Sequence, residues 1–254
     1  MANHIRQFQG QTALVTGASS GIGLATALAF GAQGAHVMVH YNHREAEARE
    51  VLARICADGG TGEVLSGDLS SMSGVSALCQ AIGGRPIDIL VNNAGSLVRR
   101  TRVLEFTPEL WEQVLTLNLT SAFFLAQAVL PGMTARGRGA IVNVSSVAAR
   151  TGGGLGALAY AAAKGALSAA TKGLAKEFAP QGVRVNAVSP GTIDTDYHQT
   201  FSTPAMLDAV RAATPMGRTG TSGEVADVIV FLASEAARFI QGQVLEVNGG
   251  FLMA

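Results

Sequence analysis

Tyr160 and Lys164 stand four residues apart, with Ala161, Ala162 and Ala163 between them. Alanine is the best helix former, and side chains four residues apart lie on the same face of a helix. A phenol with a pKa of ~10 holds its proton at neutral pH, and a nearby cation favours the phenolate. The pair can therefore move the proton that accompanies carbonyl reduction or alcohol oxidation. The alternative is a tyrosine and a lysine that merely share an exposed helix face.

A glycine-rich stretch follows the first predicted strand and opens the first predicted helix, with the sequence Thr16-Gly17-Ala18-Ser19-Ser20-Gly21-Ile22-Gly23. Glycines allow a sharp turn and a close approach to a pyrophosphate, which the helix N-terminus attracts. The spacing differs from the plain dinucleotide fingerprint, because Thr26 stands sixth from Gly21, where that pattern has glycine or alanine. The stretch predicts a phosphate-binding turn, and a purely structural turn is the alternative.

The same stretch also matches a motif of serine hydrolases. Gly17 to Gly21 fits G-x-S-x-G, in which Ser19 would be the nucleophile. That interpretation requires an acid and a histidine downstream, and the distant His198 falls in an irregular region. A hydrolase that uses Ser19 is the remote alternative.

Short β-branched runs alternate with alanine-rich stretches along the chain, which predicts βαβ units. Strands are expected at residues 12–16, 37–40, 64–66, 87–91, 140–144, 183–188 and 244–247. Helices are expected at residues 21–33, 44–57, 73–82, 108–134, 159–178 and 224–234. Nearly continuous apolar strands indicate a parallel sheet covered on both faces. We expect one doubly wound α/β domain of the Rossmann type over residues 1–254, with about seven strands, and a substrate lid in the irregular residues 191–222.

The composition excludes several classes of function. The chain has 254 residues, 48% of them apolar, and its 18 acidic residues balance its 18 basic ones. A nucleic-acid or anionic-membrane partner normally requires a basic excess, so neither is expected. Cys56 and Cys79 are expected to be buried thiols in a reducing compartment, without a disulfide or a metal site. No signal peptide or apolar membrane span stands out, so a cytoplasmic protein is expected.

Several motifs occur together in a characteristic order. They are Thr16-Gly-x-x-x-Gly-x-Gly23, Asn92-Asn93-Ala94-Gly95, Asn118, Ser146, Tyr160-x-x-x-Lys164 and Pro190-Gly191. In this order, from about Gln11 to the C-terminus, the chain resembles the short-chain dehydrogenase/reductases. The segments Gly191-Thr192-Ile193-Asp194-Thr195 and 242–250 look like those of the 3-oxoacyl-[acyl-carrier-protein] reductase branch. The resemblance implies a nicotinamide-dependent oxidoreductase acting on a carbonyl or an alcohol.

The resemblance also implies a role for each catalytic residue. Tyr160 would be the acid/base, Ser146 would bind the substrate oxygen, Lys164 would also hold the ribose hydroxyls, and Asn118 would position a water in the proton relay. Ser145 and Ser146 are adjacent, and neighbours on a strand point to opposite faces, so only one of them faces the site. Ser146 is chosen because it directly precedes the small apolar residues, as in the family.

The implied cofactor site gathers residues from several loops. Asp68, followed by Leu69, would bind the adenine amine, with a turn-capping aspartate as the alternative. Asn93, Ala94 and Gly95 would line the adenosine ribose. Thr195 and the backbone of Ile193 would hold the nicotinamide carboxamide. The full expected set is Gly17, Ser19, Ser20, Gly21, Ile22, Gly23, Tyr41, Asn42, His43, Arg44, Asp68, Leu69, Asn93, Ala94, Gly95, Tyr160, Lys164, Pro190, Gly191, Ile193 and Thr195.

The residues after the second predicted strand bear on the choice of cofactor. An NAD site places an acid there to bind the ribose 2′-hydroxyl, whereas this chain has Tyr41, Asn42, His43 and Arg44 and no acid before Glu45. A 2′-phosphate would accept charge-assisted bonds from such donors. Ser19 argues the other way, since many NADP-using relatives carry a basic residue at that position. We expect NADP(H), and NAD(H) is the alternative.

The sequence leaves the substrate and the assembly open. Arg99, Arg100 and Arg102 could meet an acidic carrier protein or a phosphorylated substrate, and a solvated or intersubunit run is the plainer interpretation. The expected lid is moderately apolar, with Tyr197, His198, Phe201, Met206 and Leu207. A 3-oxoacyl ketoreductase is favoured, and a sugar, steroid or secondary-alcohol dehydrogenase is the alternative. The family commonly forms homotetramers through its long helices and its C-terminal segment, so we expect one here. The apolar end Phe251-Leu252-Met253 is consistent with such an interface, and packing within the subunit is the alternative. A non-catalytic dinucleotide sensor would lack Tyr160 or Lys164, and both are present.

Overall fold

A single seven-stranded parallel sheet forms the centre of the molecule in the computed structural model, which describes residues 6–253 apart from the side chains of residues 197–199. Its strands are β1 (Thr12–Val15), β2 (His36–Tyr41), β3 (Thr61–Ser66), β4 (Ile89–Asn92), β5 (Gly139–Val144), β6 (Val183–Pro190) and β7 (Val244–Val247). They lie in the order β3-β2-β1-β4-β5-β6-β7. The predicted doubly wound α/β fold is confirmed.

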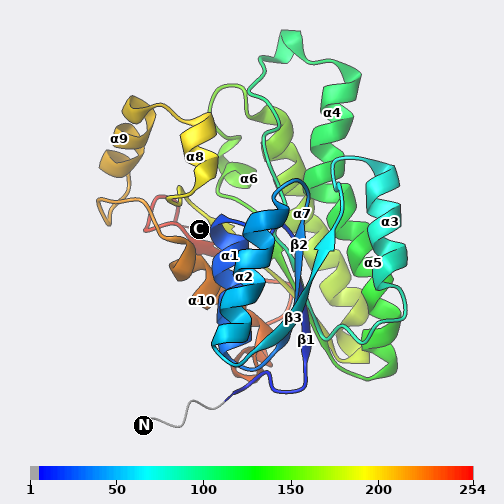
Figure 1. Cartoon of the computed structure of the whole chain (residues 1–254). Coiled ribbons are helices and arrows are strands. Elements are labelled where there is room, and N and C mark those ends of the chain that lie inside the picture. The colour runs from blue at the N-terminus through cyan, green and yellow to red at the C-terminus, as the bar shows by residue number, and fades with distance from the viewer. Residues whose placement is uncertain (1–5, 254) are drawn as a thin grey trace.

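Helices cover both faces of this sheet (Figure 1). They are α1 (Gly21–Ala32), α2 (Glu45–Ala57), α3 (Met72–Ile82), α4 (Pro108–Leu115), α5 (Ser121–Ala135), α6 (Ala148–Thr151), α7 (Leu158–Phe178), α8 (Asp196–Phe201), α9 (Pro204–Ala213) and α10 (Ser222–Ala233). On one face, α1, α2 and α10 contribute Phe30, Ile55 and Ile229 to a buried apolar cluster. On the other face, α3 and α5 contribute Leu78 and Leu125 to a second cluster.

The strand order fixes where a ligand can bind. The chain crosses from β3 at one edge of the sheet to β4 on the other side of β1, so the connections after β1 and β4 diverge to opposite faces. Ligands of open α/β sheets bind outside the carboxyl ends of the strands at such a switch point. The glycine-rich turn after β1 and the segment that begins at Asn93 after β4 both lie there.

The predicted helix at residues 108–134 is continuous but irregular. Thr107 caps it by accepting a hydrogen bond from the Leu110 N–H, and Pro108 occupies its first turn. A π-helical turn, Thr116–Thr120, separates α4 from α5. By length and apolar composition alone the stretch Pro108–Ala135 could cross a membrane. In this fold α5 packs on the sheet through buried side chains such as Val129 and Met133, as a core helix does.

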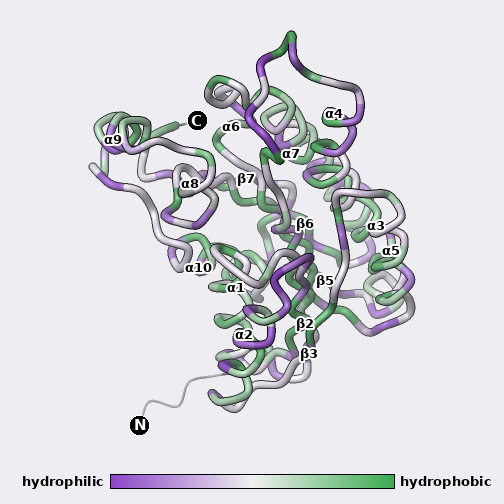
Figure 2. Tube along the Cα trace, turned by 45° about the horizontal axis from the view of Figure 1, so that its top comes forward, coloured by the Kyte–Doolittle hydropathy of each residue, from purple (hydrophilic) through white to green (hydrophobic). Residues whose placement is uncertain are grey.

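Two expectations from the sequence are wrong. Residues 191–222 are not irregular throughout, because they contain α8 and α9, and Thr203 caps α9 by accepting a hydrogen bond from the Met206 N–H. Figure 2 shows these two helices together on one side of the molecule, away from α3 and α5. Cys56 is exposed rather than buried, and Cys79 is only partly buried. The expectations for Tyr197 and His198 concern side chains outside the described set.

Candidate active site

A cavity of about 890 Å³ runs along the carboxyl edge of the sheet, beneath α8 and α9. Its wall contains most of the residues expected at the site, namely Gly17, Ser19, Ser20, Gly21, Ile22, Asn42, His43, Arg44, Asn93, Ala94, Gly95, Ser146, Tyr160, Lys164, Pro190, Gly191, Ile193 and Thr195. These residues come from the carboxyl ends of β1, β2, β4, β5 and β6 and from α7, and the fold brings them to one place. Most of the expected catalytic and cofactor residues therefore share a single cavity.

Ser146 and Tyr160 form the polar centre of this cavity. Ser146 follows β5 and Tyr160 lies in the first turn of α7, and their hydroxyl groups are hydrogen-bonded to each other. The Ser146 Oγ also accepts a bond of 3.1 Å from the Ala148 N–H, which fixes its position. Ser145 is buried, and its Oγ donates instead to the Lys164 carbonyl at 3.0 Å. Ser146, rather than Ser145, is thus the serine that meets Tyr160.

Lys164 lies under Tyr160 and is almost fully buried, with 2% of its surface exposed. Its Nζ donates to the Val144 carbonyl at 2.7 Å and lies 5.7 Å from the centre of the Tyr160 ring. Burial lowers the pKa of Lys164 to about 8. Burial also raises the pKa of the Tyr160 phenol, and the hydrogen bond from Ser146 opposes this only in part. Without bound ligand the phenol therefore holds its proton at neutral pH, and the direction of the pKa shift is opposite to the lowering that the sequence suggested.

Asn118 does not line the cavity but supports its wall from the π-helical turn. It is 1% exposed, and its Nδ2 donates to the carbonyls of Ser96 at 2.8 Å and Val114 at 2.9 Å. Its Oδ1 accepts from the Ser96 N–H at 3.1 Å. A Cβ on Gly95 would lie 2.7 Å from this Oδ1 and 3.0 Å from the Lys164 Nζ. Only glycine lets the segment after β4 approach both side chains so closely.

The glycine-rich turn is fastened to the segment after β4. The Asn93 Nδ2 donates to the carbonyls of Thr16 and Gly17 at 2.8 and 3.1 Å, and the Thr16 Oγ1 accepts from the N–H groups of Asn93 and Ala94. Gly17 has a φ of 63°, in the left-handed region that favours glycine. These bonds hold the turn open toward the cavity.

His40 is a supporting residue that the sequence reasoning missed. It is buried at the end of β2, where its Nδ1 accepts from the Gly17 N–H at 3.1 Å and its Nε2 lies 3.1 Å from the Gly67 carbonyl. The neutral tautomer with the proton on Nε2 satisfies both contacts. Burial lowers its pKa to about 4, so it stays neutral near pH 7. The sequence signal that could have found it is a histidine directly before the expected cofactor residues that begin at Tyr41.

The start of α1 has the properties of a phosphate site. Its N-cap Ser20 makes no side-chain capping bond, and no acidic residue lies in its first turn. By contrast, α10 carries a complete capping box formed by Thr221 and Glu224. The uncapped N–H groups of α1 open on the cavity beside Ser19 and Gly21. A cradle of this kind fits the diphosphate of a dinucleotide.

Four expected cofactor residues lie outside the cavity wall. Asp68 accepts bonds from the N–H and hydroxyl of Ser70, which hold its pKa below the usual value, so it behaves as the turn-capping aspartate. Leu69 and Tyr41 are buried in the two apolar clusters. Gly23 lies behind the turn, where a Cβ would be 2.2 Å from the Gly17 carbonyl oxygen. Asp68 also accepts a bond of 3.2 Å from the Nδ2 of Asn42, which lines the cavity. The contacts of these four residues with a cofactor stay predictions.

Comparisons with known proteins agree with this arrangement. A family model described as enoyl-(acyl carrier protein) reductase matches residues 17–252. The 3-oxoacyl-[acyl-carrier-protein] reductase of Synechocystis is 41% identical over 246 residues, which cover 96% of this chain and 97% of that one. The chain belongs to the short-chain dehydrogenase/reductase family. It is an oxidoreductase of that family, so the hydrolase alternative based on Ser19 is set aside.

Solved structures of the family superpose closely. A Beutenbergia cavernae protein, described as an NAD(P)-dependent gluconate 5-dehydrogenase with bound NADP, has a TM-score of 0.91 and 37% identity, and covers 98% of this chain and 100% of its own. An NADH-dependent reductase responsible for alginate metabolism has a TM-score of 0.88 and 33% identity, and covers 98% of this chain and 100% of its own. Members of this family with very similar folds therefore differ in cofactor.

Arg44 forms an ion pair at the edge of the cavity. Its Nη1 lies 2.6 Å from the Asp196 Oδ2 at the start of α8, and both side chains are about half exposed. The pair joins the loop after β2 to α8 across the cavity mouth. Among the described residues, no cluster of three histidine, cysteine or acidic side chains is placed to hold a metal ion.

Proposed function

We propose that this protein is an NADPH-dependent ketoreductase similar to the 3-oxoacyl reductases. The observation that carries the proposal is the hydrogen-bonded pair of Ser146 and Tyr160, which faces the cavity above the buried ammonium group of Lys164. A bound nicotinamide cofactor would supply the hydride. The residues of this chain would then supply the proton and the orientation of the substrate.

The proton chemistry follows from the protonation states at the site. The Ser146 and Tyr160 hydroxyl groups would bind the carbonyl oxygen of the substrate, and Tyr160 would donate its proton as negative charge develops there. The raised pKa of Tyr160 keeps the proton available at neutral pH. The charged Lys164 stabilises the phenolate that is left behind. Because its pKa is about 8, Lys164 loses this effect in alkaline solution.

Support for NADPH comes from the loop after β2. Asn42, His43 and Arg44 line the cavity there, and the first acid, Glu45, is exposed and begins α2. Donors without an acid favour a 2′-phosphate over a free 2′-hydroxyl. The NADP bound to the Beutenbergia protein is consistent with this preference. The NADH-dependent relative keeps an NAD-dependent sugar or secondary-alcohol dehydrogenase as the second candidate.

A carbonyl-substrate panel tests the proposal. Turnover is followed by the absorbance of NADPH and, in parallel, of NADH, and dissociation constants are measured for both cofactors. We expect ketone reduction with NADPH and tighter binding of NADPH than of NADH. Tighter binding of NADH would overturn the cofactor assignment, and absence of turnover with every ketone and both cofactors would overturn the ketoreductase.

A further inference from the structure

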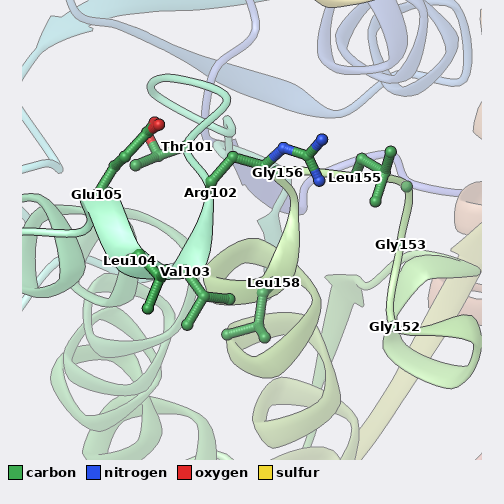
Figure 3. Close-up of a pocket in the computed structure, with 11 residues that line it drawn as sticks. Thr101, Arg102, Val103, Leu104, Glu105, Gly152, Gly153, Leu155, Gly156 and Leu158 are labelled. Atoms are coloured by element: carbon green, nitrogen blue, oxygen red, sulfur yellow. The ribbon is translucent and has the colours of Figure 1, made fainter.

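The three arginines that follow the segment after β4 have different surroundings. Arg102 is exposed and lines a shallow cavity of about 640 Å³ between residues 101–105 and 152–158, where Figure 3 shows its side chain extending toward Leu155. Arg99 is exposed and contacts the Thr101 hydroxyl at 3.4 Å. Arg100 is partly buried and lines the cavity that holds Ser146 and Tyr160. Only Arg100 of the three therefore reaches the candidate active site.

The backbone before Arg100 is strained in the way often found at functional sites. Val98 has a φ of 61°, the one positive value among the described residues other than glycine, and a β-branched side chain is poorly tolerated there. Such strain persists only where the surrounding structure holds it, and it clusters at ligand-binding positions. The backbone of Arg100 and Thr101 then packs on Gly156, whose Cβ would lie 3.1 Å from the Thr101 nitrogen. The turn thus delivers Arg100 to the cavity at a cost in conformational energy.

Two backbone carbonyls fix the guanidinium of Arg100. Its Nε donates to the Phe201 carbonyl of α8 at 2.7 Å, and its Nη1 donates to the Leu155 carbonyl at 2.9 Å. A guanidinium has five N–H donors in one plane, so three remain, including both on Nη2. Within the described part of the chain, no carboxylate forms an ion pair with Arg100. A fixed, planar cation with free donors faces the cavity.

The charge of the cavity wall favours an anionic ligand. Arg44, Arg100 and Lys164 are its arginine and lysine residues, and Asp196 is the only carboxylate among its described lining residues. Asp196 forms its ion pair with Arg44 at the cofactor end of the cavity, whereas Arg100 contacts the Phe201 carbonyl at the other end of α8. Apolar side chains such as Leu97 and Met206 also line the cavity. Apolar surroundings strengthen the attraction between Arg100 and an anion.

We infer that Arg100 binds a carboxylate of the substrate, so that the substrate class is an oxo acid and its product a hydroxy acid. The inference rests on the proposed ketoreductase function and names its substrate class. The remaining Arg100 donors match the two oxygens of a planar carboxylate. With Arg100 on the carboxylate and Ser146 and Tyr160 on the ketone oxygen, the substrate is held at two points. Two-point binding would select both the reacting carbonyl and its orientation.

Matched acids and esters test the inference. The probes are 4-oxopentanoate, 5-oxohexanoate and the methyl ester of each, assayed at saturating NADPH with the wild type, Arg100→Gln, Arg100→Lys and the control Arg102→Gln. We expect the wild type to prefer the acids. Arg100→Gln should lower kcat/KM for the acids roughly 10- to 100-fold, because one charge-assisted contact is lost. It should lower kcat/KM for the esters much less, because they lose only the support that Arg100 gives to α8. For the acids, kcat/KM of Arg100→Lys should lie between the values of the wild type and of Arg100→Gln, and Arg102→Gln should behave as the wild type.

A second measurement separates this inference from the proposed function. Binding of each acid and ester is followed by thermal shift in the presence of NADP⁺, which requires no turnover. We expect acids to stabilise the wild type but not Arg100→Gln. If Arg100→Gln loses the stabilisation by acids and by esters equally, Arg100 only holds α8, and the inference is overturned. Acids that bind the wild type no better than esters would overturn it as well. Acid binding without turnover of any ketone would instead contradict the ketoreductase and leave the carboxylate site standing.

Discussion

Lys164 and His40 are both buried bases, and burial lowers the pKa of each for the same reason. Water no longer solvates the charged form, so the neutral form becomes easier to reach. At Lys164 the pKa of about 8 places the loss of charge just above neutrality, beside the phenol that it supports. At His40 the pKa of about 4 keeps the ring neutral, so that it can accept from Gly17. Burial therefore sets the protonation state that each position needs.

The pKa of His40 predicts a loss of stability in acid. The unfolded chain binds a proton at this residue below about pH 6.5 and the folded chain only below about 4, so stability falls as the pH drops from 6.5 to 4. The full contribution is about 3 kcal/mol. Urea unfolding at pH 7 and at pH 4.5 should show most of this loss in the wild type and less of it in His40→Gln. His36→Gln, on the same strand, is the control, and an unchanged pH dependence in His40→Gln would contradict the assignment.

Replacement of Gly95 should lower both stability and turnover, which replacement of an unhindered glycine should not do. Gly95→Ala would force its Cβ against the Asn118 and Lys164 side chains, and overpacking of this kind costs about 1–3 kcal/mol. We expect a lower melting temperature and reduced turnover, because Lys164 must move. Gly173→Ala is the control: Gly173 lies in α7 with no atom within 4 Å of its Cβ, so that variant should be as stable as the wild type or more stable. Full activity in Gly95→Ala would contradict the close approach.

Most elements could be predicted from the sequence because their signals are local. The ends of α1, α2, α3, α7 and α10 and of most strands lie within one or two residues of the predicted ends. The helices α8 and α9 were missed because their surroundings are rich in turn-forming residues. The Thr203-Pro204 pair, a capping residue before a first-turn proline, was a usable signal for α9.

Side-chain roles were harder to predict than elements. The sequence predicted that Ser146, Tyr160 and Lys164 meet at one site, but it could not show that the Asp68 carboxylate is bonded to Ser70 and Asn42. Nor could it separate Arg100 from its neighbours, since that distinction depends on carbonyls more than fifty residues away. Long-range contacts of this kind leave no local pattern in the sequence.

The ion pair between α8 and the loop after β2 predicts a cofactor-specific effect. Asp196 occupies the Arg44 guanidinium, so Asp196→Asn should release Arg44 for the 2′-phosphate of NADPH. An exposed pair of this kind contributes about 0–1 kcal/mol, so NADPH affinity should rise by up to about fivefold while NADH affinity stays the same. Titration of cofactor fluorescence measures both. Asp194→Asn is the control, and equal changes for the two cofactors would show that Arg44 does not bind the phosphate.

At the scale of the whole molecule, two apolar clusters explain why one sheet can hold the site rigidly. Each face of the sheet is covered by helices, and the cavity lies at the carboxyl edge, where the short helices α6, α8 and α9 and the loops cover it. The rigid part supplies Ser146 and Lys164, whereas the part above the cavity supplies Phe201 and Met206. In the reaction that we propose, the residues that move the proton lie on the side of the sheet, and α8 and α9 cover the space for the rest of the substrate.

The outer surface predicts self-association. Trp111 on α4 and Phe123 on α5 are 37% and 45% exposed, on the helices expected to meet in a homotetramer. Sedimentation should give four times the 26.0 kDa mass of one chain. Phe123→Glu should yield smaller species, since a buried charge at an interface is costly. Arg54→Glu, at an exposed position on α2, is the control, and a monomeric wild type would contradict the prediction.

The most direct test of the central claim is turnover of the best ketone substrate by Tyr160→Phe, with NADPH binding measured on the same sample. The variant keeps the ring beside Lys164 and loses only the hydroxyl that meets Ser146. We predict that turnover falls by at least about 100-fold, as expected when a general acid is removed, while the dissociation constant for NADPH stays within about threefold. Turnover that survives in Tyr160→Phe would contradict the role assigned to Tyr160.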